Sequence, residues 1–161
     1  MNSMKIGAVK ELPSNNNSPS YIPYNDRFIM GGNGIPYGNV LRGYDDNRVG
    51  PLTSTGNPIG GNTLVKFSTE FRVPFAENPV VYGMVFAEMG NVWSSTDLMD
   101  RLSLPRSGPL DLKRSVGVGV RFFMPMIGML GFDFARGFDR VDNNGKLKPE
   151  WKTTLTFGQQ F

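Results

Sequence analysis

The chain contains several segments in which apolar and polar residues alternate with a period of two. In residues 63–75 the valines and phenylalanines fall at odd positions, whereas Lys66, Glu70 and Arg72 fall at even positions. Successive side chains of a strand point to opposite faces, so this period indicates a strand with one apolar and one polar face. The same reasoning predicts strands at residues 63–73, 113–124, 128–136 and 151–161.

Residues 80–93 are apolar at nearly every position, with Glu88 near the end, and we predict a strand there as well. A sixth strand within residues 4–12 has only a weak pattern. The predicted strands are about ten residues long, which exceeds the average of about 5–6 residues in soluble proteins and suits the 9–11 residues, roughly, of a membrane-crossing strand. One apolar and one polar face per strand is also the pattern of a transmembrane β-barrel.

The connections between these strands alternate between long and short. Long connections and short turns on opposite sides are typical of outer-membrane barrels, whose short turns face the periplasm. The alternation therefore predicts a periplasmic C-terminus. An antiparallel meander in a soluble sandwich is the alternative. The connections in chain order are residues 13–62, 74–79, 94–112, 125–127 and 137–150.

Composition removes several classes of function. The 161 residues include no cysteine and no histidine, which excludes zinc fingers, thiol nucleophiles, Ser-His-Asp triads and a disulfide framework. The net charge is only +3, with basic and acidic residues mixed along the chain, so nucleic-acid binding is not favoured. The longest uncharged apolar run, residues 122–132, is too short for a spanning helix, which needs about 20 residues.

Two glycine-containing clusters lie in the long connection, at Met30–Gly34 and at Leu41–Asp46. The glycine spacing matches neither a dinucleotide-binding fingerprint nor a P-loop, so phosphate binding is disfavoured. From the residues alone, a turning loop with a solvated Arg42 remains open.

Several segments together resemble the BamA-like outer-membrane assembly factors, also called the bacterial surface antigen family. Leu41-Arg42-Gly43-Tyr44 is similar to the (V/I/L)RG(F/Y) loop motif of that family, and residues 27–32 resemble the segment that enters the same loop. Residues 86–93 resemble its acidic-x-Gly-x-Val-Trp strand end, residues 114–138 the hairpin that follows, and residues 157–161 its last strand.

The resemblance implies an all-β fold: the last five or six antiparallel strands of a sixteen-stranded transmembrane barrel, with residues 13–62 as a long loop folded into the lumen. It implies that POTRA domains and earlier strands are absent from this chain. The implied function is the insertion and folding of β-barrel proteins in the bacterial outer membrane, without catalysis, metal or cofactor. The implied partners are unfolded outer-membrane clients, accessory lipoproteins and the lipid bilayer. A two-partner secretion pore and a passive surface antigen are the alternatives.

The resemblance also implies roles for individual residues. Arg42 of the loop motif (Leu41, Arg42, Gly43 and Tyr44) is expected to pair with Glu70 and Glu88 in the lumen. A hydrolase that uses both carboxylates as acid and base is the alternative, but an arginine between them would keep both ionised. The C-terminal sorting signal is expected to comprise Leu155, Phe157, Gly158 and Phe161.

The alternation assigns the remaining side chains to faces. Arg121 and Asp133 are expected to form a cross-strand ion pair on the polar face. The residues expected to face inward are Lys66, Glu70, Arg121, Asp133 and Lys152. The residues expected to face lipid are Val65, Phe67, Phe71, Val118, Phe132, Phe134, Leu155 and Phe157.

Overall fold

The computed structural model describes residues 1–10, 22–34, 38–94, 108, 111–126, 128–141 and 146–157. These residues form one sheet of six antiparallel strands, in which sequence order and spatial order agree. The antiparallel all-β architecture that the alternation predicts is therefore confirmed, whereas barrel closure and the number sixteen stay predictions. The strands are β1 (Asn2–Ala8), β2 (Thr63–Glu77), β3 (Val80–Trp93), β4 (Lys113–Met124), β5 (Gly128–Gly137) and β6 (Trp151–Phe157).

The strands differ from the sequence-based ranges at their ends. β1 occupies Asn2–Ala8, earlier than the weak pattern in residues 4–12 indicated, and pairs with β2. β2 continues four residues beyond the expected end, to Glu77, because a register shift at Pro74–Ala76 accommodates the proline within the ladder. β6 is described to Phe157, and the expected continuation to residue 161 lies outside the described residues.

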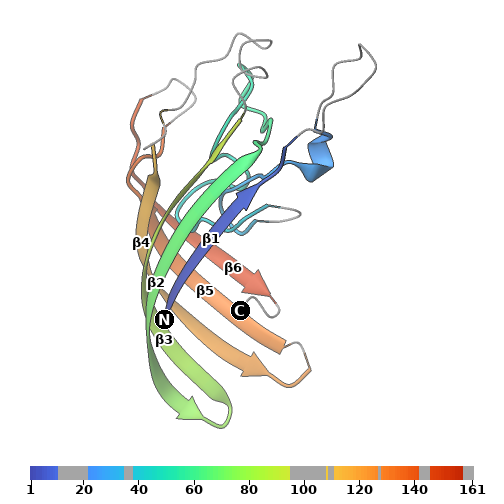
Figure 1. Cartoon of the computed structure of the whole chain (residues 1–161). Coiled ribbons are helices and arrows are strands. Elements are labelled where there is room, and N and C mark those ends of the chain that lie inside the picture. Colours follow the sequence, from blue (N-terminus) through green and yellow to red (C-terminus); the bar gives the residue numbers. More distant parts are fainter. Residues whose placement is uncertain are drawn as a thin grey trace, which may run out of the picture.

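The sheet is bent into a trough (Figure 1). The β2–β3 and β4–β5 hairpins close at one end of it, and the strand ends that adjoin the long connections lie at the other. β1 and β6 are the two edge strands of the sheet. A cavity of about 470 Å³ on the inner side is lined by residues of both edge strands, Lys5 and Thr156 among them, and by Arg42 of the connection between β1 and β2. The part of this connection around Arg42 therefore lies on the inner side of the sheet.

Residues 22–34 and 38–62 of this connection contain a short 3-10 helix at Tyr24–Asp26 and are hereafter called the inner loop. Its own apolar residues Met30, Leu41, Tyr44 and Val49 pack as a buried cluster with Leu64 of β2 and Val92 of β3. Leu64 and Val92 are directly opposite each other in the ladder. Burial of these side chains removes apolar surface from water and attaches the loop to the inner face of the sheet.

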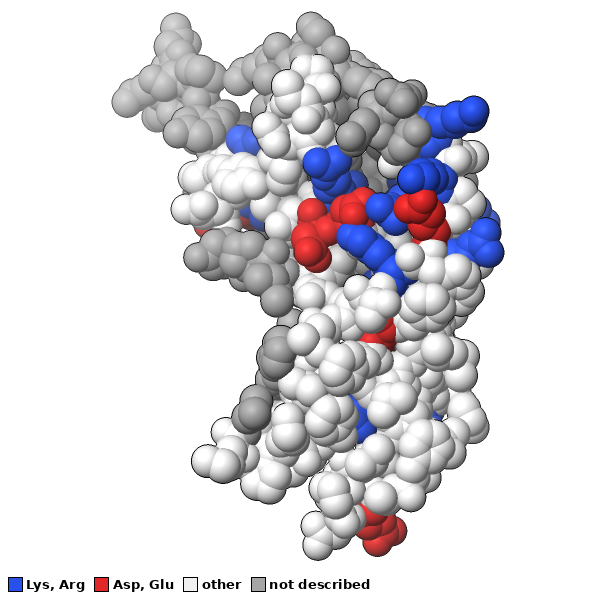
Figure 2. All heavy atoms as spheres, turned by 180° about the vertical axis from the view of Figure 1, so that it is seen from behind, with Lys and Arg blue, Asp and Glu red and all other residues white. Residues whose placement is uncertain are grey.

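The two faces of the sheet differ sharply in charge. The register places Lys5, Lys66, Glu70, Arg72, Glu88, Arg121, Asp133 and Lys152 on the inner face. In the central stretches of the strands, none of the residues that point to the outer face is charged. These stretches are Val65–Val73, Val81–Met89, Val116–Phe122, Leu130–Phe134 and Thr153–Leu155. In Figure 2 the charged atoms of one side of the molecule gather mostly towards one end, and much of the remaining surface is uncharged.

The outer face is also exposed. Phe71 and Val118 expose 71% and 50% of their surface, and Phe132 and Phe134 expose 46% and 45%. Val65, Phe67 and Leu155 of the set expected to face lipid are partly buried, and the side chain of Phe157 lies outside the described residues. These side chains do not form a closed core, as a soluble sandwich requires. Within the described residues, no helix is long and apolar enough to cross a membrane.

Candidate functional site

The loop motif is held in place by residues on both sides of Arg42. Leu41 is fully buried in the loop cluster. Gly43 has a positive φ of 87°, and a Cβ at this position would lie 2.8 Å from the main-chain nitrogen of Gly137. Only glycine combines this left-handed conformation with such a close approach to β5. The backbone around Arg42 is thereby fixed, and its side chain extends across the inner face of the sheet.

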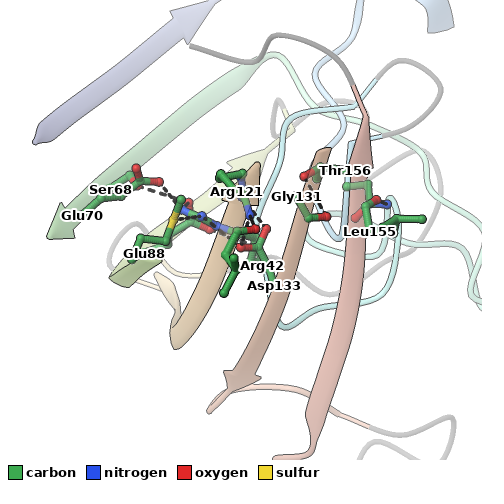
Figure 3. A network of polar contacts seen from close by, with 12 residues as sticks. Arg42, Ser68, Glu70, Glu88, Arg121, Gly131, Asp133, Leu155 and Thr156 are labelled. Carbon is green, nitrogen blue, oxygen red and sulfur yellow. Dashed lines mark hydrogen bonds and ion pairs between the residues drawn. The ribbon is translucent and has the colours of Figure 1, made fainter. Parts of the chain in front are cut away.

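Arg42 contacts both glutamates that the resemblance implies as its partners (Figure 3). Its Nη2 atom donates to Oε1 of Glu70 at 2.6 Å and to Oε1 of Glu88 at 2.7 Å. The main-chain N–H of Arg42 also donates to Oε2 of Glu88, at 2.9 Å. The structure thus brings together β2, β3 and the inner loop through one guanidinium group, whose planar fork of donors can serve more than one carboxylate.

The guanidinium of Arg42 also lies against apolar groups of β3. Its central carbon is 3.6 Å from the ring centroid of Phe86, and Nη1 lies 3.5 Å from the sulfur of Met84. A cation over an aromatic face is stabilised by the ring quadrupole, more so when the pair is desolvated. The apolar inner face of β3, which obscures the position of Glu88 in the sequence pattern, is the surface on which Arg42 rests.

Further charges complete the cluster. Lys66 Nζ lies 3.1 Å from Glu88 Oε1, and Arg72 Nη2 lies 2.7 Å from Glu70 Oε2. Asp133 of β5 is a third carboxylate near Arg42, with Oδ1 at 3.8 Å from Nη1. Sequence reasoning missed these three neighbours of the Arg42–Glu70–Glu88 group. The side chains of Arg42, Glu88 and Asp133 are at most 5% exposed, so each charge depends on its partners rather than on water.

The expected ion pair between Arg121 and Asp133 is confirmed. It is bidentate, with Nη1 to Oδ1 at 2.8 Å and Nη2 to Oδ2 at 2.7 Å. The two residues are diagonal in the ladder, because Arg121 lies opposite Gly131 and Asp133 opposite Gly119. A Cβ at Gly119 would lie 2.2 Å from an Asp133 oxygen, so the absence of a side chain leaves the space in which Asp133 reaches Arg121 and Arg42.

Tyr44, the last residue of the motif, connects the loop to the ends of β4 and β5. Its hydroxyl donates to the carbonyl of Arg114 at 2.7 Å and accepts from the main-chain N–H of Asp139 at 3.3 Å. Burial of the hydroxyl raises the pKa of Tyr44, although the hydrogen bond donated by the Asp139 main-chain N–H acts in the opposite direction. No pattern in the sequence indicates these partners, which lie 70 and 95 residues away.

Asp45 follows the motif and links the loop to β6. Its carboxylate is hydrogen-bonded to Lys152 of β6 and lies 2.8 Å from Arg140 Nη2. Burial by itself would raise the pKa of Asp45, but the hydrogen bond and charge of Lys152, with those of Arg140, outweigh burial and lower it. Arg140 has the position of an external-loop residue in the sequence, yet it also reaches Glu150 at 3.4 Å and belongs to this link.

The residues expected to form the C-terminal sorting signal are described in part. Leu155 lies in β6, opposite Phe132 of β5, and is partly buried. Phe157 ends the described part of β6 and pairs with Leu130. Gly158 and Phe161 lie outside the described residues, so the structure places neither of them.

The arrangement can hold a loop against a sheet by ion pairing. Glu70 and Glu88 contact the same nitrogen atom of Arg42, whereas a general acid requires a carboxyl group that keeps its proton. Among the described residues, no group of three or more His, Cys, Asp or Glu side chains has a metal-binding arrangement.

The chain was compared with models of known protein families. Residues 6–161 match the model of the Omp85 superfamily domain, which is nearly the whole chain. This match agrees with the antiparallel sheet, with the partition of its faces and with the order of the motifs along the chain.

Proposed function

The chain belongs to the Omp85 superfamily, and we propose that it is the C-terminal part of a BamA-like barrel that inserts and folds other β-barrel proteins in the bacterial outer membrane. The superfamily includes outer-membrane barrel proteins that act in insertion and others that act as secretion pores. The proposal within this range is that the clients are unfolded outer-membrane proteins, that accessory lipoproteins assist, and that neither catalysis nor a cofactor is involved.

The observation that carries the proposal is the charged cluster around Arg42 on the inner side of a sheet whose outer face is uncharged. A passive barrel needs an apolar outer face and a polar interior, but it does not need a long loop fixed inside by buried ion pairs. Arg42 joins the loop to three strands at once, through Glu70 of β2, Glu88 of β3 and Asp133 of β5. Such a cluster is expensive to desolvate, which supports a role in keeping the loop at one position.

The proposed barrel has sixteen strands, of which the described six are the last. β1 and β6 lie at the two edges of the described sheet, so each has one row of main-chain groups that no other strand pairs with. Within a bilayer these edges need further strands, because closure alone satisfies every backbone group. In the proposed mechanism β6 pairs weakly with the first strand, so its edge can serve as a template for an incoming client strand.

The orientation that we propose is supported by the two ends of the trough. β6 begins at Trp151, opposite Arg136, and runs towards Leu130, so it ends near the short turn between β4 and β5. In outer-membrane barrels the short turns face the periplasm. We therefore propose a periplasmic C-terminus, with Leu155, Phe157, Gly158 and Phe161 as the sorting signal of the protein itself.

The test uses the purified full-length protein in liposomes and a urea-unfolded porin as the client. We expect folded, heat-modifiable porin to form several-fold faster than in empty liposomes. Arg42→Ala should remove most of this acceleration, and Arg114→Ala, which changes an arginine that is 63% exposed, should leave it. Translocation of an exported passenger without porin insertion would favour a secretion pore, and neither activity would favour a passive surface antigen.

A further inference from the structure

The inner loop makes one contact with β6 that the Arg42 cluster does not explain. The side-chain Nδ2 of Asn33 donates to the main-chain carbonyl of Leu155 at 2.8 Å, across 122 residues of sequence. Asn33 belongs to the glycine-containing cluster Met30–Gly34, whose Met30 packs in the buried apolar cluster. Figure 3 shows Leu155 and its neighbour Thr156 on β6, with Thr156 next to Gly131 of β5.

The Leu155 carbonyl lies on the free edge of β6. In an antiparallel ladder the backbone groups of alternate residues point to opposite sides. The N–H of Phe138 donates to the carbonyl of Arg114. The main-chain N–H and C=O groups of even-numbered β5 residues therefore point towards β4, and those of odd-numbered β5 residues point towards β6. Odd-numbered residues of β5 pair with even-numbered residues of β6, as Ala135 does with Lys152. The main-chain groups of odd-numbered β6 residues, including the Leu155 carbonyl, therefore point away from β5.

An amide N–H on that carbonyl takes the place of a neighbouring strand. A strand added at this edge would run about 4.8 Å from β6 and would donate its own main-chain N–H to the same acceptor. The amide of Asn33 already occupies this position. A strand and the Asn33 side chain therefore exclude each other at Leu155, whether the strand is the first strand of the proposed barrel or comes from a client.

The backbone of the loop is built to hold Asn33 there. Gly32 and Gly34 have positive φ values of 51° and 70°, and a Cβ at Gly32 would lie within 3 Å of Asp46 atoms. The main-chain N–H of Asn33 donates to Asp46 Oδ1 at 2.8 Å. These features involve the backbone of Asn33 and not its side chain, so a substitution at this position removes the contact with β6 and retains the turn.

We infer that Asn33 is a latch that occupies the strand-pairing position of β6 and must leave Leu155 before a client β-strand can pair there. The inference rests on the proposed function, because it takes the β6 edge as the place of client pairing. It adds that the loop controls access to this edge. The partner is recognised through main-chain hydrogen bonds, so any extended strand of suitable length can displace the latch.

The test measures strand addition directly. The probe is a synthetic peptide with the sequence of residues 148–161 and benzoylphenylalanine in place of Phe157. The peptide is irradiated with the full-length protein in lipid nanodiscs, and mass spectrometry locates the cross-links. Asn33→Ala and Asn33→Asp both remove the donor, the second at nearly unchanged size. Asn57→Ala is the control, since the Asn57 amide contacts Thr55 within the same loop.

We expect cross-linking to β6 to rise about two- to tenfold in both Asn33 variants, the range that loss of one hydrogen bond of the latch predicts, and to stay unchanged in Asn57→Ala. Equal cross-linking in wild type and both Asn33 variants overturns the latch and leaves the proposed function intact. A rise of cross-linking in Asn57→Ala has the same two consequences. Absence of cross-links at β6 in every variant contradicts strand pairing at this edge, and with it the proposed mechanism. Resistance of each variant to SDS at room temperature separates these outcomes from loss of the fold.

Discussion

Two of the polar attachments of the inner loop to the sheet differ in burial. At β2, β3 and β5 the attachment is Arg42 with its carboxylates, and the side chains of Arg42 and Glu88 are 5% and 1% exposed. At β6 the attachment is Asp45 with Lys152, each 34% exposed, together with the Asn33 contact. The charges that attach the loop at β2, β3 and β5 are thus buried, whereas those that attach it at β6 are partly exposed.

This difference has an energetic basis. A buried ion cluster is costly to desolvate and strongly destabilised when one member is removed, whereas an exposed pair is screened by water and contributes little. A loop with both kinds of attachment can release β6 without leaving β2 and β3. The following predictions test this difference, from the largest expected effect to the smallest.

Arg42→Ala should have the largest effect. The substitution leaves Glu88 buried with Lys66 and Ser68 but without the guanidinium, and removal of one partner of a buried pair costs about 3–5 kcal/mol. Denaturant unfolding of the full-length protein in detergent measures the loss. Arg42→Lys should recover only part of it, because one ammonium cannot serve both glutamates and stack on Phe86.

The matched control is Arg114→Ala, which removes an exposed arginine from its pair with Asp139. We expect little change in stability. A loss as large as that of Arg42→Ala would contradict the distinction between buried and exposed attachments.

Gly43→Ala should have the next largest effect. A side chain at the positive φ of Gly43 is strained by about 1–3 kcal/mol, and the new Cβ would also meet the main chain of Gly137. Gly56→Ala separates the two causes, since Gly56 has a similar φ of 81° but its nearest neighbour is 3.6 Å away. The thermal midpoints of both variants in detergent give the comparison. Equal losses would show that the close approach to β5 adds nothing.

Tyr44→Phe should have a smaller effect. It removes the hydroxyl that donates to Arg114 and accepts from Asp139, at an expected cost of about 0.5–1.5 kcal/mol. Hydrogen exchange at the amide of Asp139 should accelerate as well, because that N–H loses its acceptor. Tyr24→Phe, at an exposed tyrosine of the same loop, should leave both measurements unchanged.

The sequence predicted the sheet well where a strand has one uncharged face and one mixed face. β2, β4 and β5 satisfy this condition, and their alternation reflects a sheet with only one apolar side. β3 does not, because Met84 and Phe86 on its inner face support Arg42 and the loop. β1 was placed several residues late, since its seven residues offer too few alternations to define a strand.

The candidate site was predictable only where a motif indicated it. The resemblance named Arg42, Glu70 and Glu88, which the structure brings together. It did not name Asp133, although the glycine opposite this residue is visible in the sequence once the register is known. The contacts of Asn33 and Asp45 with β6 span more than a hundred residues, and no local pattern of hydrophobicity or charge can indicate such a pairing.

The smallest effect is expected at the attachment to β6, and its pH dependence identifies it. Asp45 has a lowered pKa in the folded protein, because Lys152 and Arg140 outweigh the effect of burial. A carboxyl with a lowered pKa contributes stability at pH values above its unfolded pKa of about 4, and this contribution is lost as the pH falls through the folded value.

Asp45→Asn should therefore lower the thermal midpoint slightly at pH 7, equivalent to about 0.2–1 kcal/mol for a pair of this exposure. The difference between wild type and variant should shrink as the pH falls below about 4 and disappear once it is below the folded pKa of Asp45, since a protonated aspartate and an asparagine carry the same charge. Other carboxylates titrate in the same range, but they do so in both proteins and cancel in the difference. A difference that persists unchanged at pH 3 would mean that Asp45 acts through its shape and not its charge, and the light attachment of β6 would then rest on the Asn33 contact.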